Sequence, residues 1–363
     1  MTSFPAIPNG ARALLSPIRF DGFDVSWAGT SPHKALFVFG SEDGRILFAD
    51  LEGAVQIEAA KVAPSGEAIN GVAFIQRWMS VSTRNEVILW VPPQKPGENA
   101  MATPIPFGVH GVIAGHSGYF LAPLGRSGLL VYRPEEGPKT AGTVIGVAIE
   151  NAYFYRAISL QTAGGQEIVA CAARRGGVAA MEFKGKDQPH MLRMATYSDL
   201  DVVDLCSIGM DSAPEAAAAV GREGTIILFR DVLRDSRPET IKYESIKGTA
   251  YRILSARGYL FLLTSEGMYV IAGLMERFLS GAADNSITPV LALPMEAVDA
   301  NLGSEQWLWI VMPDGVLRLD VDLLDRITPT NPFRNISPTS MTPDWHRQEV
   351  EQHSRLVPAG AIG

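Results

Sequence analysis

The chain has 363 residues, of which 47% are hydrophobic and 19% are charged, and its formal net charge at pH 7 is −8. This apolar fraction supplies a sizeable core and excludes a disordered chain, while the acidic balance argues against a protein that binds phosphate backbones. Two cysteines are too few for a disulfide framework or a zinc site, which is typical of a reducing compartment.

The N-terminal region shows no targeting signal. Residues 1–20 lack a basic start followed by an apolar run, so they do not resemble a signal peptide. The chain also contains no run of about 18 consecutive apolar residues, the length that a membrane-spanning helix requires. The sequence therefore predicts a cytoplasmic protein that does not enter a membrane.

Along the chain, seven short apolar runs are each joined by a tight turn to a second apolar run. The first pair occupies residues 34–50 and the last occupies 305–321. Glycine and asparagine adopt the positive φ angles that short hairpin loops require, so each pair predicts a β-hairpin. The turn residues lie 41 to 49 positions apart: Gly44, Asn85, Gly128, Gly177, Gly224, Gly267 and Gly315.

Each hairpin is preceded by an apolar run with a polar start, and most are followed by a looser fourth run. Seven units of four strands, each about 45 residues long, predict an all-β fold, a seven-bladed β-propeller of four-stranded blades. The last unit lacks its own fourth run. We expect a strand at about 13–20 to complete it and close the ring, which removes exposed sheet edges. A three-stranded last blade closed by the C-terminus is the alternative.

Several hairpins resemble those of WD-repeat propellers. Residues 224–231 read GTIILFRD, with Phe229 at the tryptophan position of the family and Arg230 at the aspartate position. Trp90 matches the tryptophan itself, but Val91 follows it instead of aspartate. The pattern extends over residues 12–325. The resemblance implies a rigid platform whose faces bind peptides or domains, an expectation that rests on fold analogy.

Two segments lie outside the repeat. Apolar residues at helical spacing in 274–285 predict a short helix. We assign residues 1–326 to the propeller and residues 327–363 to a tail rich in proline, threonine and serine. Within the tail, a short helix is predicted at about 343–355. It is expected to dock through Trp345 and Val350, on the propeller or on a partner, the alternative being a disordered tail.

The polar starts of the inner strands form the most informative set of candidate site residues, because inner strands line the axial channel of a propeller. One interpretation is a mixed-charge ring at the channel mouth, a candidate binding face. The other is a divalent metal site built on the aspartates and the asparagine, although two arginines in the same ring disfavour a cation. The strand register decides between these interpretations, since a slip by one residue moves each side chain to the opposite face of the sheet. The set is Asp24, Asn70, His110, Arg156, Asp204, Arg252 and Asp299.

No nucleophile elbow, HExxH motif, P-loop or GxGxxG motif occurs in a strand-to-helix context. His346 and His353 share one helix face but lack a third strong ligand. Arg174 and Arg175, in one hairpin turn, are predicted to be exposed turn charges, because a nucleic-acid surface needs a more basic domain.

The sequence therefore predicts a non-catalytic scaffold for protein–protein interactions. We expect a monomeric propeller within a complex of several proteins, with a protein partner, no cofactor, no bound metal and no nucleic acid. The alternative is a metal-dependent propeller hydrolase or lactonase that would use Asp24, Asn70, Asp204 and Asp299.

Overall fold

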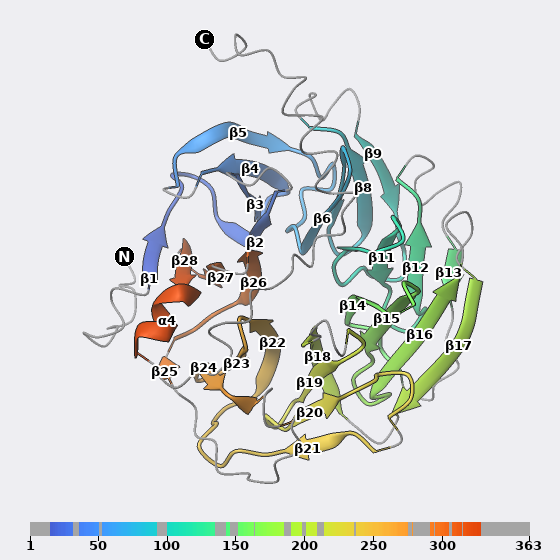
Figure 1. Ribbon diagram of the computed structural model, residues 1–363. Helices are drawn as coiled ribbons and strands as arrows, with labels where there is room; N and C mark the ends of the chain where they lie inside the picture. The colour runs from blue at the N-terminus through green and yellow to red at the C-terminus, as the bar shows by residue number, and fades with distance from the viewer. Residues whose placement is uncertain are drawn as a thin grey trace.

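Seven four-stranded antiparallel sheets surround a central axis in the computed structural model (Figure 1). The predicted seven-bladed propeller is thereby confirmed. The structure describes residues 15–31, 36–50, 53–92, 100–134, 143–145, 152–162, 164–184, 190–197, 201–208, 214–235, 237–274, 278, 291–293, 295–304, 307–313 and 315–327.

The strands follow one another from the axis outward in blades 1 to 6, so hairpins connect neighbours. Blade 1 contains β2 (Val25–Thr30), β3 (Phe37–Ser41), β4 (Arg45–Ala49) and β5 (Val55–Lys61), and blade 2 contains β6 (Gly71–Ile75), β7 (Trp78–Ser82), β8 (Glu86–Trp90) and β9 (Met101–Pro104). Blade 3 contains β10 (Ile113–Ala114), β11 (Phe120–Pro123), β12 (Leu129–Tyr132) and β13 (Thr143–Ile145), and blade 4 contains β14 (Arg156–Gln161), β15 (Glu167–Ala172), β16 (Val178–Lys184) and β17 (His190–Tyr197). Blade 5 contains β18 (Val202–Ser207), β19 (Ala217–Gly221), β20 (Ile226–Phe229) and β21 (Glu239–Ile241), and blade 6 contains β22 (Ala250–Ala256), β23 (Tyr259–Thr264), β24 (Gly267–Ala272) and β25 (Leu291–Leu293).

Blade 7 is completed by the N-terminal strand. Its own strands are β26 (Asp299–Ser304), β27 (Trp307–Met312) and β28 (Gly315–Asp320), and β1 (Leu15–Ile18) pairs with β28, Ile18 lying opposite Val316. The sequence placed this strand at about 13–20. Ile18 and Trp309 are buried with side chains of blade 1. The N-terminal strand therefore joins the first and last blades and leaves the ring without a free edge there (Figure 1).

A helix that the sequence reading did not anticipate follows the last blade strand. The helix α4 (Val321–Ile327) begins where the apolar run of β28 continues, and the Asp320 side chain accepts a hydrogen bond from the Asp322 backbone N–H at 2.9 Å. Val321 and Leu324 are buried against blades 6 and 7. In Figure 1 this helix lies at the edge of the ring between β28 and β25. Among the described helices, none has the length and apolarity required to cross a membrane.

Two predicted helices lie partly or wholly outside the described residues. In the 274–285 segment, Leu274 and Phe278 are helical and buried, and the remaining residues lie outside the described part. The tail helix expected at 343–355, with Trp345 and Val350, lies wholly outside the described residues.

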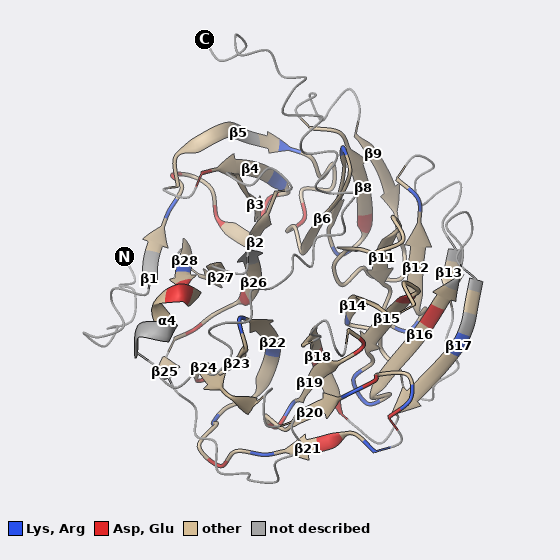
Figure 2. Ribbon diagram, in the orientation of Figure 1, with Lys and Arg blue, Asp and Glu red and all other residues tan. Residues whose placement is uncertain are grey.

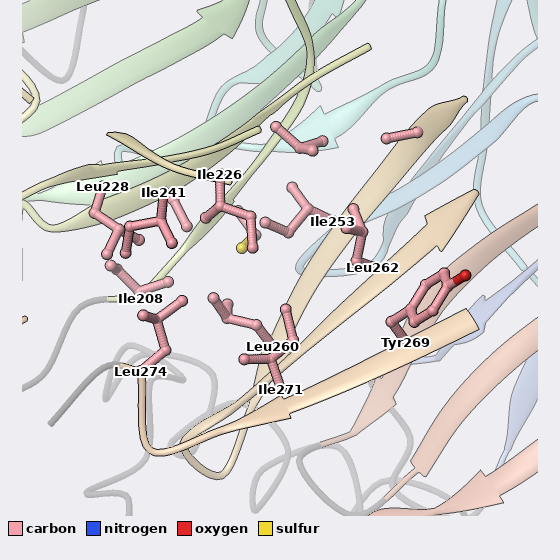
Figure 3. Close-up of a cluster of buried hydrophobic side chains, with 14 of the residues drawn as sticks. Ile208, Ile226, Leu228, Ile241, Ile253, Leu260, Leu262, Tyr269, Ile271 and Leu274 are labelled. Carbon is pink, nitrogen blue, oxygen red and sulfur yellow. The ribbon is translucent and has the colours of Figure 1, made fainter. Parts of the chain in front are cut away.

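The core consists of seams between neighbouring blades. Figure 3 shows Ile226 and Leu228 of blade 5 gathered with Leu260, Leu262 and Ile271 of blade 6. Because each blade packs against a neighbour on both faces, its middle strands are apolar on both sides, which explains why the sequence has continuous apolar runs instead of strict alternation. Cys171 and Cys206 are buried free thiols.

One end of the propeller carries the starts of the inner strands and the turns between the second and third strands. We call this end the turn face. Along it, each turn contacts the next blade: the carbonyls of Arg84, Arg174 and Arg222 accept hydrogen bonds from Val109, Val202 and Ala250. These contacts bring turn side chains close to the inner strands of the following blade.

Candidate functional site

Four of the seven predicted ring residues converge in one ion cluster at the axis. Arg156, Asp204, Arg252 and Asp299 come from the inner strands of blades 4, 5, 6 and 7, and Figure 2 shows charged positions on β14, β22 and β26 around the axis. The Arg156 guanidinium lies 3.3 Å from the Asp299 carboxylate, although their blades are separated by two others. The cluster thus crosses the central channel.

Arg252 is the centre of this cluster. Its Nη1 lies 3.3 Å from Asp204, its Nε lies 3.2 Å from Asp299, and its Nη2 donates to the Asn301 amide oxygen at 2.6 Å. Asp204 is fully buried and also accepts a hydrogen bond from the Ile253 backbone N–H at 2.8 Å. Two positive and two negative side chains therefore neutralise one another in a space with little solvent.

The pairing register at the start of each inner strand determines which residues reach the cluster. Register shifts near the starts of β18 and β22 place Asp204 opposite Val220 and Arg252 opposite Leu263, and Asp299 lies opposite Val311. In each case the opposite residue lies just before the hairpin turn. In blades 1 and 2 the corresponding positions are Trp27, opposite Gly40, and Gly71, opposite Ser82. The polar ring is therefore confined to one side of the axis.

The remaining three predicted ring residues do not join the cluster. Asp24 is exposed, and its backbone carbonyl accepts a hydrogen bond from the Glu42 N–H at 2.9 Å. Asn70 is bound by its own surroundings: its amide nitrogen donates to the Val109 carbonyl at 2.8 Å, and its oxygen accepts from the Ser82 hydroxyl. The four carboxylate and amide ligands of the alternative metal site are thus not assembled around one point.

The electrostatics of the cluster favour the charged forms of Asp299 and Arg156 but not that of Asp204. Burial alone would raise the pKa of Asp299, but Arg156 and Arg252 outweigh it and hold the pKa below its ordinary value. Burial likewise works to lower the pKa of Arg156, which Asp299 and Asp204 nevertheless raise. Burial raises the pKa of Asp204, against the attraction of Arg252 and Arg156. Both acceptor carboxylates are occupied by arginines and do not fit a cation site. Among the described residues no group of three His, Cys, Asp or Glu side chains is placed to hold a metal.

A second cluster lies beside the first, on the turn face of blades 3 and 4. We call it the tyrosine–arginine cluster, and it consists of His110, Tyr153, Tyr155 and Arg174. The His110 Nε2 and the Tyr153 hydroxyl are 2.8 Å apart, and the centre of the His110 ring lies 5.0 Å from the centres of both tyrosine rings. The guanidinium carbon of Arg174 lies 5.5 Å from the Tyr153 ring centre and 4.9 Å from that of Tyr155. The arginine head is thus positioned by two aromatic rings.

The backbone of the tyrosine–arginine cluster explains its geometry. Tyr153 and Tyr155 flank Phe154, which is 1% exposed and bridges Gly125 of blade 3. Because side chains alternate along an extended segment, the two tyrosines project to the opposite side together. Arg174 has a φ angle of 47°, a left-handed conformation that non-glycine residues adopt at a cost.

Arg174 differs from the sequence-based expectation. It was predicted to be an exposed turn charge, but it is half-buried against the two tyrosines, whereas its neighbour Arg175 is exposed. The tyrosines themselves were missed. Their signal in the sequence is the Tyr-Phe-Tyr-Arg alternation just before β14, which places two aromatic rings on one side of the chain.

Burial is the largest cause that lowers the pKa of His110, to about 4, and Arg174, Arg156 and Arg84 add to it in that order. The imidazole is therefore neutral at pH 7. In this neutral form one ring nitrogen donates and the other accepts hydrogen bonds. The shift also shows that three arginines act on the same small region of the turn face.

Further exposed side chains lie on the turn face. Arg84, Arg126 and Arg175 are exposed, and within the described part of the chain none of them forms an ion pair, unlike Arg222 in the next turn, which lies 3.8 Å from Asp201. Phe107, in the segment that contacts the Arg84 turn, is 58% exposed. Val298, before β26 on the same face, is also 58% exposed. These are the two most exposed large apolar side chains of the described residues.

The opposite end of the propeller contains a serine, a histidine and a glutamate in contact. The Ser159 hydroxyl lies 2.6 Å from His116 Nδ1 and 2.8 Å from Glu167, whose carboxylate also accepts hydrogen bonds from the backbone N–H groups of His116 and Ser117. The serine lies between the other two groups, whereas a hydrolytic triad needs the histidine in the middle. Glu167 therefore caps the turn after β10, and Gly115 leaves room for its carboxylate.

Comparisons with known proteins support the fold. No family model and no curated protein matches the sequence. Among solved structures, the β-propeller domain of Cps50 (Swd1) from Myceliophteria thermophila aligns with a TM-score of 0.62 and 13% identity, covering 84% of this chain and 99% of that one. The WD40 β-propeller domain of Doa1 aligns with 0.59 and 12%, covering 84% and 95%.

A propeller enzyme is equally similar in fold. Streptogramin B lyase aligns with a TM-score of 0.61 and 12% identity, covering 84% of this chain and 97% of that chain. At such low identities the likeness shows the fold alone, and any chemistry has to be inferred from the residues of the site. The protein is thus a seven-bladed β-propeller that resembles WD40 domains in fold.

Proposed function

We propose that this protein is a non-catalytic interaction platform that binds a protein partner through the turn face, on the side of blades 2 to 4, within a larger complex. The observation that carries the proposal is the coincidence of exposed Phe107 with arginines that have no ion-pair partner among the described residues. Exposed aromatic and arginine side chains are the types that dominate binding energy at protein interfaces.

The charge distribution on the turn face also supports a directional contact. The turns of blades 2, 3 and 4 carry Arg84, Arg126 and Arg175, all exposed, whereas the turns of blades 1 and 6 carry exposed Glu42, Asp43 and Glu266. A partner with complementary charges would be oriented on this face, because complementary potentials fix the register of an encounter. The overall charge of −8 means that this basic side is a local exception.

The hydrolase or lactonase alternative is less well supported. It would need Asp204 and Asp299 as ligands, and both carboxylates are engaged by arginines. Its support is the similarity in fold to streptogramin B lyase, a lyase by name. Elemental analysis of the purified full-length protein is expected to show no stoichiometric divalent metal, and a bound equivalent would favour the enzyme.

Affinity capture from the native source tests the platform. We expect one or more proteins to co-purify with the tagged full-length chain and to be lost with Phe107→Asp. The matched control is Met194→Asp on the outer strand β17, where Met194 is 41% exposed. This control places the same charge on a different surface and should retain the partner. Equal loss in both variants, or equal retention in both, would contradict a turn-face interaction.

A further inference from the structure

We infer that the tyrosine–arginine cluster is a subsite for one acidic side chain of a bound peptide segment, a carboxylate or a phosphate that Arg174 receives. This inference rests on the proposed function and specifies the partner chemistry at the same face. Its basis is the arrangement of Arg174 relative to the rings, the lack of a counter-charge among the described residues and an exposed apolar side chain on the same face.

The position of Arg174 prepares it for an anion. The guanidinium carbon of Arg174 lies over both rings, 5.5 Å from the Tyr153 ring centre and 4.9 Å from that of Tyr155, so the two rings restrict the head group. A guanidinium carries its N–H donors in a planar fork, which matches the two oxygens of a carboxylate or phosphate. The side chain thus loses little further conformational entropy on binding, since the rings already restrict it.

The charge of Arg174 is uncompensated within the described residues, in contrast to its neighbours in the ion cluster. Arg156, 5.4 Å from the same Tyr155 ring, is paired with Asp299. No ion pair with Arg174 is found in the part of the chain that the structure describes, and its Nε is buried there without a hydrogen-bond partner. The Arg156 Nε is likewise buried without a hydrogen-bond partner among the described residues, so Arg174 is distinguished by its missing counter-charge.

The Tyr153 hydroxyl, the His110 imidazole and the Arg84 side chain can also take part in recognition of the acidic group. The Tyr153 hydroxyl and the His110 imidazole already contact each other at 2.8 Å, and each keeps additional hydrogen-bonding capacity. Arg84 adds positive charge from the neighbouring turn, and the segment that carries Phe107 contacts that turn through the Val109 N–H. A partner segment that carries an acidic and an apolar residue would therefore find a complement for each on the turn face.

The overall charge favours a peptide over a nucleic acid. A protein with a net charge of −8 repels a polyanion at long range, and the acidic turns at Glu42, Asp43 and Glu266 lie on the same face. A single acidic side chain delivered by a peptide needs only the local arginines. An oligonucleotide would need a continuous basic surface.

The test uses the full-length protein and three fluorescein-labelled peptides of one design, Gly-Ser-Phe-X-Gly-Ser, in which X is glutamate, phosphoserine or glutamine. Fluorescence anisotropy is expected to show that at least one acidic peptide binds about tenfold or more tightly than the glutamine peptide, since hydrogen bonds to charged groups are the stronger ones. The glutamate and phosphoserine arms distinguish the two sources of negative charge. A single-stranded oligonucleotide of the same charge is the competing probe.

Arg174→Gln should remove the preference for the acidic peptide, whereas Arg222→Gln, in the equivalent turn of blade 5, should change it less than about twofold, because Arg222 is exposed and already near Asp201. Circular dichroism melts confirm that both variants remain folded. Equal binding of the acidic and glutamine peptides, an unchanged preference in Arg174→Gln, or tighter binding of the oligonucleotide would each overturn the inference. If Arg174→Gln still captures the cellular partner that Phe107→Asp loses, the subsite fails while the interaction platform stands.

Discussion

Arginines on the two sides of the turn face are used differently. On the side of blades 4 to 7, Arg156 and Arg252 point to the axis and are neutralised by Asp204 and Asp299. On the side of blades 2 to 4, the exposed Arg84, Arg126 and Arg175 have no ion pair within the described residues. Burial requires counter-charges, whereas exposure at a rim leaves a charge available for a partner. The two groups should therefore respond in opposite ways to substitution.

The largest expected effect on stability comes from opening the ring. Without β1, blade 7 is no longer fastened to blade 1, and Asp299 is no longer held opposite Arg156 of blade 4. Deleting residues 1–20 removes β1 and the buried Ile18 from β28. We expect a loss of unfolding free energy on the order of 5 kcal/mol or more, from the lost side-chain burial and strand pairing. Urea titration measures it. Pro17→Ala, at an exposed position of the same strand, is the control, and an unaltered midpoint in the deletion would argue against closure by β1.

A smaller but still large effect is expected on the paired side. Asp299→Ala leaves the buried Arg156 and Arg252 with one carboxylate between them. Removing one partner of a buried ion pair costs about 3–5 kcal/mol of unfolding free energy. Asp43→Ala, which breaks the exposed pair with Arg45, should cost at most about 1 kcal/mol. Similar midpoints for the two variants in urea would mean that the axis cluster is not a buried ion network.

On the unpaired side, stability and binding should separate. Arg84→Ala and Arg126→Ala remove exposed side chains and should each change the unfolding free energy by no more than about 0.5 kcal/mol. The double variant should nonetheless capture less of the cellular partner than the wild type. Chemical unfolding and quantitative capture from the same preparation check both statements. A strong destabilisation would show that these arginines are structural, as on the paired side.

The smallest effect is a pH dependence caused by His110. Its pKa is lowered to about 4 by burial and then by Arg174, Arg156 and Arg84, while an unfolded chain protonates histidine near ~6.5. As the pH falls through this window the unfolded state binds the proton first, so the native state loses stability. Above the window there is no such loss. His110→Gln should therefore lose less stability than the wild type between pH 7.5 and 4.5, as measured by urea midpoints. Parallel curves would contradict a buried neutral imidazole.

The sequence by itself determined the architecture. Glycine or asparagine at seven turns, 41 to 49 residues apart, with apolar runs on both sides, specifies hairpins through local φ preferences and side-chain burial. Even the closing strand was readable, because the last unit lacks a fourth run and the first is preceded by an unassigned one. These features are local or periodic, so they survive without knowledge of which blade contacts which.

Tertiary structure alone decided the site. The polar starts of the inner strands look alike in sequence, but the pairing register brings Asp204 and Arg252 to the axis and leaves Asp24 at the surface. Tyr153 and Arg174 are 21 positions apart and meet only because the β14–β15–β16 pairing folds the turn back over the start of the inner strand. Strand register and the stacking of distant side chains depend on packing among all blades. A shift of one residue in register moves a side chain to the opposite face of the sheet, so no local sequence pattern could determine these contacts.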